Sequence, residues 1–160
     1  MDKEMLEADP FQLDDFLPYK LVKTAAHVAD SLAHIYEREF GLSRAQWRIL
    51  ASLGAREGIK AKELAEETSL DKVRVSRTLV EMEQKGWVSK ERDAKDQRAA
   101  FLHLTDKGKQ LYVEILPKAR AWEKGLMSGI EWQEYQSFLK TLDALLEKAG
   151  GDPRRTIREP

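Results

Sequence analysis

The chain has 160 residues, 42% of them hydrophobic and 34% charged, which suits one compact domain, and its net charge is −1. It contains no cysteine, which excludes disulfides, thiolate nucleophiles and cysteine-based redox sensing. No apolar run approaches the roughly 20 residues that span a bilayer, and the acidic N-terminus lacks the features of a secretory signal. We therefore expect a cytoplasmic protein with no membrane partner.

Charge is distributed unevenly along the chain. Residues 1–17 hold six acidic residues against one basic residue, whereas residues 71–98 hold eight basic residues against six acidic ones. Affinity for DNA depends mainly on Lys and Arg side chains that meet phosphates. A basic surface on an acidic body is therefore compatible with the small net charge.

The first predicted element is a long amphipathic helix over residues 14–40, because apolar residues recur there at three- and four-residue steps. A second, shorter helix follows. Ser43 and Gln46 have the spacing of a capping box at its start, and Gly54 is expected to end it.

Two further short helices are predicted on either side of a tight turn. The third covers residues 60–68, and the turn leads to Asp71, a favourable N-cap for a fourth helix that runs to Lys85. This arrangement is typical of a helix-turn-helix. Val75, Leu79 and Met82 form the inward stripe of the fourth helix. The outward positions are then Val73, Arg74, Ser76, Arg77 and Gln84.

Two strand-like runs, residues 87–92 and 99–104, flank a polar turn at 93–98 and predict a β-hairpin. Thr105 is placed to cap a fifth helix, which Pro117 should kink and which Gly125 and Gly129 should end.

The last predicted helix, residues 131–148, carries its apolar residues on one face, and residues 151–160 are expected to form a flexible tail. The predicted fold is mainly α with a small β-hairpin, in one domain over residues 1–150. Residues 43–104 form its winged helix. The long helices at 14–40 and 105–148 are too apolar for so small a core to cover, so a second copy of the chain is the expected cover.

The region 87–108 resembles the MarR family of winged helix-turn-helix regulators. Its Asp96-Gln97-Arg98 turn, followed by Leu104-Thr105-Asp106-Lys107-Gly108, matches that family's wing signature of Asp-x-Arg and then Leu-Thr-x-x-Gly. Leu64-Ala65, Leu79 and Lys85-Gly86 fall at the expected offsets upstream, so the resemblance covers roughly residues 14–148. It implies a dimer whose terminal helices interdigitate and whose fourth helices enter the major groove.

The residues expected to contact DNA lie on the fourth helix and at the tip of the hairpin. Arg77 can pair with guanine through two hydrogen bonds, and Val73 suits a thymine methyl group. Arg98 resembles the family arginine that enters the minor groove, with Asp96 orienting it through a salt bridge. The predicted DNA-binding set is Lys72, Val73, Arg74, Ser76, Arg77, Lys95, Asp96 and Arg98.

The resemblance also implies a crevice that binds a small aromatic or phenolic anion. Arg48 can hold a carboxylate, and Trp47 together with His27 can line an aromatic ring. The alternative is that Trp47 belongs to the core and Arg48 is an ordinary surface charge. His27, Asp30 and His34 share one helix face, but two histidines and one aspartate make a poor metal site, so no metal or cofactor is expected.

The predicted function is a sequence-specific transcriptional regulator that binds pseudo-palindromic double-stranded operators as a homodimer. The resemblance favours a repressor that a small aromatic ligand releases from DNA. The chain has no glycine-rich phosphate loop and no nucleophile elbow, and its three histidines form no recognised acid–base arrangement, so we do not expect an enzyme. The alternative is a winged-helix module for protein–protein contact, in which the fourth helix and hairpin would lack their cationic residues.

Overall fold

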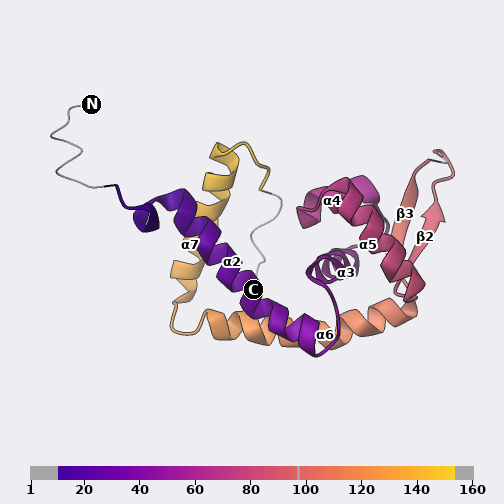
Figure 1. The fold of residues 1–160 in the computed structure, drawn as a ribbon, viewed down its shortest axis with the longest axis horizontal. Coiled ribbons are helices and arrows are strands. Elements are labelled where there is room, and N and C mark those ends of the chain that lie inside the picture. The colour runs from indigo at the N-terminus through magenta and orange to yellow at the C-terminus, as the bar shows by residue number, and fades with distance from the viewer. Residues whose placement is uncertain (1–10, 97, 154–160) are drawn as a thin grey trace. The chain divides into compact units, whose positions relative to one another are not determined.

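The computed structural model describes residues 11–96 and 98–153 and has the predicted mainly helical fold with a small β-sheet (Figure 1). In chain order the elements are η1 (Leu13–Asp15), α2 (Leu17–Arg38), α3 (Arg44–Ala55), β1 (Ile59–Lys60), α4 (Ala61–Thr68), α5 (Lys72–Gln84), β2 (Val88–Arg92), β3 (Ala100–Leu104), α6 (Asp106–Leu126) and α7 (Trp132–Lys148). The chain forms two compact units, the first ending at Ala119 and the second beginning at Arg120. Of the predicted tail, residues 154–160 lie outside the described part. None of the described helices is both long and apolar enough to cross a membrane.

The three strands form one antiparallel sheet in the order β1-β3-β2. The hairpin of β2 and β3 was predicted and is confirmed, with Val88 paired to Leu104 at its base and Arg92 paired to Ala100 toward its tip. The sequence did not predict β1, because two residues are too few to show an alternating pattern. Pairing with Leu102 and Phe101 of the central strand places β1 in the sheet, and Ile59 is buried there.

Capping side chains define the starts of α3 and α5 as the sequence predicts. At α3 the Ser43 hydroxyl accepts the backbone N–H of Gln46 at 3.2 Å, while the Gln46 side chain accepts the backbone N–H of Ser43 at 3.1 Å. At α5 the Asp71 carboxylate accepts the backbone N–H of Arg74 at 2.8 Å. The two boundaries are therefore fixed by local hydrogen bonds.

Gly54 does not end α3, so that prediction was wrong. The helix continues to Ala55, and Gly54 lies within it. A Cβ atom at Gly54 would lie 2.5 Å from the ring of Tyr112, which belongs to α6. The glycine therefore serves the close approach of two helices rather than a helix end.

The core of the first unit is built from one face of each short helix and from the inner face of the sheet. The predicted stripe of Val75, Leu79 and Met82 on α5 is buried, which turns the opposite face of this helix outward. The core residues are Ala33, Tyr36, Leu42, Ile49, Leu50, Leu53, Ile59, Leu64, Ala65, Val75, Leu79, Met82, Val88, Leu102, Leu104 and Ile115.

The Leu-Thr-x-x-Gly segment fastens the start of α6 to the end of α5. The Thr105 hydroxyl donates to the carbonyl of Gly86 and accepts the backbone N–H of Gly108 at 3.1 Å. A Cβ atom at Gly108 would lie 2.1 Å from the backbone oxygen of Trp87. The position therefore requires glycine, because any side chain would collide with main chain.

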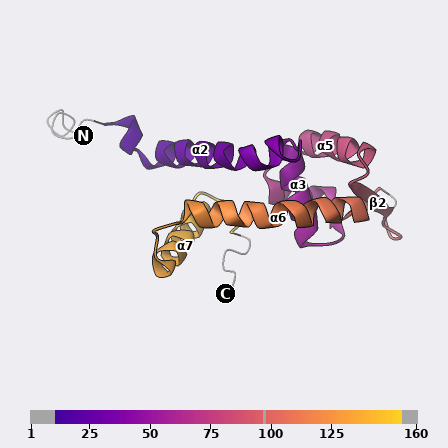
Figure 2. The ribbon, with the colours of Figure 1, turned by 90° about the horizontal axis from the view of Figure 1, so that it is seen from below.

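Beyond this point α6 passes through Pro117 without interruption and ends at Leu126, close to the predicted glycines. In the second unit, α7 has an apolar face but no buried residue. Figure 2 shows α2 as one long helix, and its N-terminal half likewise exposes large apolar side chains. The large exposed apolar residues in these two helices and in the segments just before them are Phe11, Leu13, Phe16, Leu17, Tyr19, Leu21, Val22, Leu126, Ile130, Trp132, Phe138 and Leu146.

Candidate nucleic-acid interface

The outward face of α5 displays the residues that the sequence selects. Val73 is 68% exposed although it is apolar, and Arg77 lies one turn further along the same face. Lys72, Arg74 and Ser76 beside them are exposed as well. The face thus combines cations, a hydroxyl and an apolar group, as direct contact with base edges and phosphates requires.

Many cations elsewhere in the first unit are neutralised by carboxylates. Examples are Arg44 with Asp30 at 2.6 Å and Lys90 with Glu83 at 2.9 Å. By contrast, within residues 11–96 and 98–153 no ion pair involves the cations predicted to contact DNA, which are Lys72, Arg74, Arg77, Lys95 and Arg98. Positive charge is therefore left uncompensated on α5 and on the hairpin, where an anionic partner would meet it.

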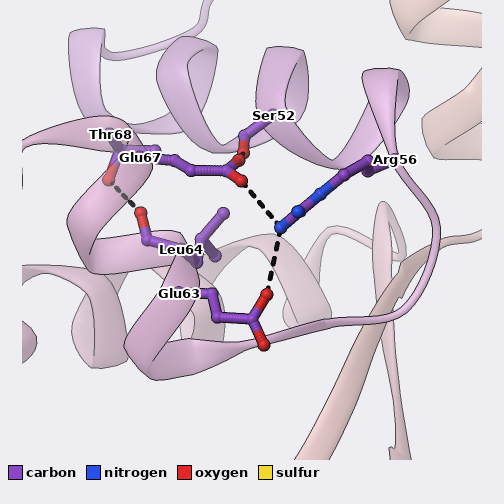
Figure 3. A network of polar contacts seen from close by, with 6 residues as sticks. All are labelled: Ser52, Arg56, Glu63, Leu64, Glu67 and Thr68. Atoms are coloured by element: carbon purple, nitrogen blue, oxygen red, sulfur yellow. Dashed lines mark hydrogen bonds and ion pairs between the residues drawn. The ribbon is translucent and has the colours of Figure 1, made fainter. Parts of the chain in front are cut away.

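A polar network holds α3 against α4 (Figure 3). The Arg56 guanidinium lies 2.7 Å from a carboxylate oxygen of Glu67 and 3.1 Å from one of Glu63, and the Ser52 hydroxyl donates to Glu67. Within α4 the Thr68 hydroxyl donates to the carbonyl of Leu64 at 2.6 Å. Each exposed ion pair adds little stability, but together they join α4, the first helix of the helix-turn-helix, to α3.

Two further contacts fix α5 itself. The Gln46 side chain donates to the Glu81 carboxylate at 3.1 Å and so joins α3 to α5. The ion pair of Glu83 with Lys90 joins α5 to β2. In Figure 1 the hairpin of β2 and β3 lies beside α5, and α5 contacts β2, so both basic surfaces belong to the first unit.

Carboxylates shape the turn between β2 and β3, which we call the wing turn. Asp93 accepts the backbone N–H of Lys95 at 2.9 Å, and Asp96 accepts the backbone N–H of Arg98 at 3.0 Å. Asp96 therefore accepts a hydrogen bond from the Arg98 backbone and, within the described residues, forms no ion pair with the Arg98 guanidinium as was predicted. The physical reason is that an Asp side chain readily accepts the backbone N–H two residues further on, which forms a local turn. Lys95 and Arg98 are exposed, and Gln97 lies outside the described residues.

The predicted effector residues are placed differently from one another. Trp47 is half-buried on α3 and stacks on Tyr36 of α2, with ring centroids 5.8 Å apart and planes at 12°. Arg48 donates to the backbone carbonyl of Thr68 at 3.2 Å. His27 is exposed on α2, nine residues before Tyr36 and so about 13.5 Å from it along the helix.

Tyr36 is therefore the α2 residue that contacts Trp47, and the sequence analysis did not select it. Tyr36 is buried in the core of the first unit. Burial also raises the pKa of the Tyr36 phenol above its usual value.

Asp30, considered earlier beside the two histidines of its helix, has a cationic partner. Its carboxylate accepts from the Arg44 guanidinium, and this hydrogen bond raises the pKa of Arg44. Within the described part of the chain, no three potential metal ligands cluster.

Comparison with known proteins agrees with this geometry. The family model that matches is that of the MarR family, over residues 40–99. The transcriptional regulator MgrA of Staphylococcus aureus is 29% identical over 108 residues, which are 68% of this chain and 74% of that regulator. A MarR-family regulator from Silicibacter pomeroyi is 28% identical with a TM-score of 0.75, covering 92% of this chain and 96% of that one. The PcaV regulator of Streptomyces coelicolor, solved with its natural ligand, shares the fold at 16% identity, with a TM-score of 0.75 and coverage of 88% and 99%.

Proposed function

The chain belongs to the MarR family of transcriptional regulators, and we propose that it binds double-stranded DNA as a homodimer through α5 and the wing turn. The observation that carries this proposal is that the cations of α5 and the wing turn are exposed and enter no ion pair within residues 11–96 and 98–153, on two elements of the same unit. The proteins that the chain resembles are transcriptional regulators and not enzymes, so the proposed function requires DNA binding and no catalytic step.

We assign sequence readout to α5 and groove-width readout to the wing turn. Arg77 pairs with guanine and Val73 meets a thymine methyl group, while Lys72, Arg74 and Ser76 contact phosphate or base edges. At the wing turn Arg98 enters the minor groove and Lys95 meets a phosphate. Asp96 supports both by shaping the turn through the backbone N–H of Arg98.

Two exposed apolar regions support the homodimer. The start of α2 in the first unit and the face of α7 in the second unit both expose large side chains, among them Phe16, Tyr19, Trp132 and Phe138. Exposed apolar surface of this extent is typical of a protein interface. A second copy of the chain would bury this surface and would also supply the α5 helix and wing turn that bind the second half-site.

The experiment that tests this function is selection of bound duplexes from a random pool. A symmetric dimer predicts an enriched pseudo-palindrome with two half-sites centred about 10 base pairs apart. The competing function, a winged-helix module for protein–protein contact, predicts no enrichment. The free cations of α5 favour DNA over that alternative, because a protein-binding face has no need of them.

The wing turn gives a prediction for salt dependence. Lys95→Ala should flatten the plot of log K against log salt by up to about two units, because one phosphate contact is lost in each subunit of the dimer. The preferred sequence should stay the same, since phosphate contacts carry no sequence information. Fluorescence anisotropy across a salt series measures both. The matched control is Lys140→Ala on α7; if the Lys95 variant keeps the slope as this control does, Lys95 lies outside the interface.

We propose further that the protein represses transcription and is released by a small aromatic carboxylate held near Trp47 and Arg48. Ligand binding by the structurally similar PcaV supports this, as do the half-buried Trp47 and the cation beside it. The bond from Arg48 to Thr68 occupies only one N–H of the guanidinium, which leaves others for a carboxylate. That bond also joins α3 to the end of α4, so a ligand there would act on the helix-turn-helix directly.

The effector proposal predicts that one of a panel of benzoate, salicylate and hydroxycinnamate compounds weakens the protein–DNA complex about 5–150-fold, a usual range of coupling between two sites. Arg48→Ala should respond less, because the carboxylate loses its cation. Anisotropy titration of each compound against the preformed complex measures the shift, with the exposed Arg38→Ala as control. A panel without effect, or an Arg48 variant that responds fully, contradicts the site.

A further inference from the structure

Lys60 occupies the junction between the sheet and the helix-turn-helix. Its backbone pairs with Phe101 across β1 and β3, and the next residue begins α4. Its side chain reaches the wing turn: Nζ lies 3.1 Å from Oδ2 of Asp93 and 5.0 Å from the centroid of the Phe101 ring. The Lys60 side chain of β1 thus contacts Asp93, the first residue after β2.

Asp93 uses its two carboxylate oxygens in two directions. Oδ1 accepts the backbone N–H of Lys95 within the turn, and Oδ2 faces Lys60 in the body. Its side chain is only 14% exposed, against 38% for Lys60. The Lys95 amide and then the Lys60 ammonium hold the pKa of the Asp93 carboxyl below its usual value, so the group is an anion at neutral pH. The backbone N–H of Asp93 donates to the carbonyl of Ala99 and closes the turn.

We propose that the ion pair of Lys60 with Asp93 positions the wing turn relative to α5, so that both surfaces meet one duplex together. This inference rests on the DNA binding proposed above. Among the ion pairs of the described chain, it is the one that joins the turn to β1. A turn released from it would have to be ordered during binding, at a cost in affinity.

Two variants of nearly unchanged shape distinguish positioning of the wing turn from a direct effect of charge on DNA affinity. Lys60→Met keeps the apolar stem over Phe101, and Asp93→Asn keeps an acceptor for the Lys95 amide. Charge alone predicts opposite effects on DNA affinity, because one variant removes a cation and the other removes an anion. Positioning predicts that both weaken binding, roughly two- to fivefold per half-site, the range that a partly exposed ion pair supports.

The readouts are anisotropy on A·T-flanked and G·C-flanked duplexes and NMR amide exchange of the free protein. An Arg98 side chain in the minor groove predicts that the parent protein prefers A·T flanks, because these narrow the groove. We expect both variants to lose this preference and the double variant to add no further loss. The Lys95 amide should exchange faster in both variants, while Val75 in α5 keeps its rate. Lys62→Met on α4 is the control, since within the described residues Lys62 enters no ion pair. Tighter binding by Asp93→Asn, or an unchanged Lys95 exchange rate, overturns the positioning role. If the parent protein binds no duplex, the proposed function fails, while the exchange rates still decide whether Lys60 holds the turn.

Discussion

Replacing Gly108 by Ala is expected to lower the free energy of unfolding by about 3 kcal/mol, the upper part of the usual range for overpacking. The new Cβ would lie 2.1 Å from the backbone oxygen of Trp87, and a main-chain atom yields less readily than a side chain. Relief requires the start of α6 to move away from the end of α5, which breaks the bond from the Gly108 N–H to Thr105. The better helix propensity of Ala offsets only about 1 kcal/mol of this.

Gly125 provides the matched control for this substitution. It lies in the same helix, and an added Cβ would meet no atom within 4 Å. Gly125→Ala should therefore leave stability unchanged or raise it by up to about 1 kcal/mol. Urea unfolding followed by circular dichroism at one protein concentration compares the two variants, since the stability of a dimer depends on concentration. Equal stabilities would show that α6 accommodates the methyl group at Gly108.

The second large effect is expected at Arg77. Arg77→Ala should weaken binding to the preferred duplex by about 1–3 kcal/mol per half-site, because a bidentate pair with guanine has no substitute. Random-sequence duplex should lose much less, since base contacts specify and phosphate contacts position. Arg77 is exposed on the face of α5 opposite the buried Val75, Leu79 and Met82, so its replacement by Ala should leave the core undisturbed.

Anisotropy titrations of the preferred and random duplexes at one salt concentration measure this difference. Arg38→Ala is the control, because Arg38 is an exposed arginine of α2 that lies outside both basic surfaces. Losses of equal size on the two duplexes would assign Arg77 to the phosphate backbone. A loss as small as that of the control would remove it from the interface.

The sequence alone determined those features whose causes lie within a few residues. The capping box of Ser43 and Gln46 and the Asp71 cap begin their helices where predicted, because the donor and acceptor are three residues apart. The buried stripe of α5 follows from helical periodicity, and this stripe dictates which side chains face outward. The sequence alone therefore determined which face of α5 is exposed and carries the candidate DNA contacts.

Only the tertiary structure decided the features that join distant segments. Gly54 reads as a helix end, yet it faces Tyr112 of α6, and Lys60 reads as a helix start, yet it pairs with Asp93. The strand β1 exists only because β3 lies beside it. Tyr36, and not His27, contacts Trp47, because the fold brings that part of α2 beside α3. Such contacts depend on how the chain returns upon itself, and a single sequence carries no periodic or capping signal for a partner tens of residues away.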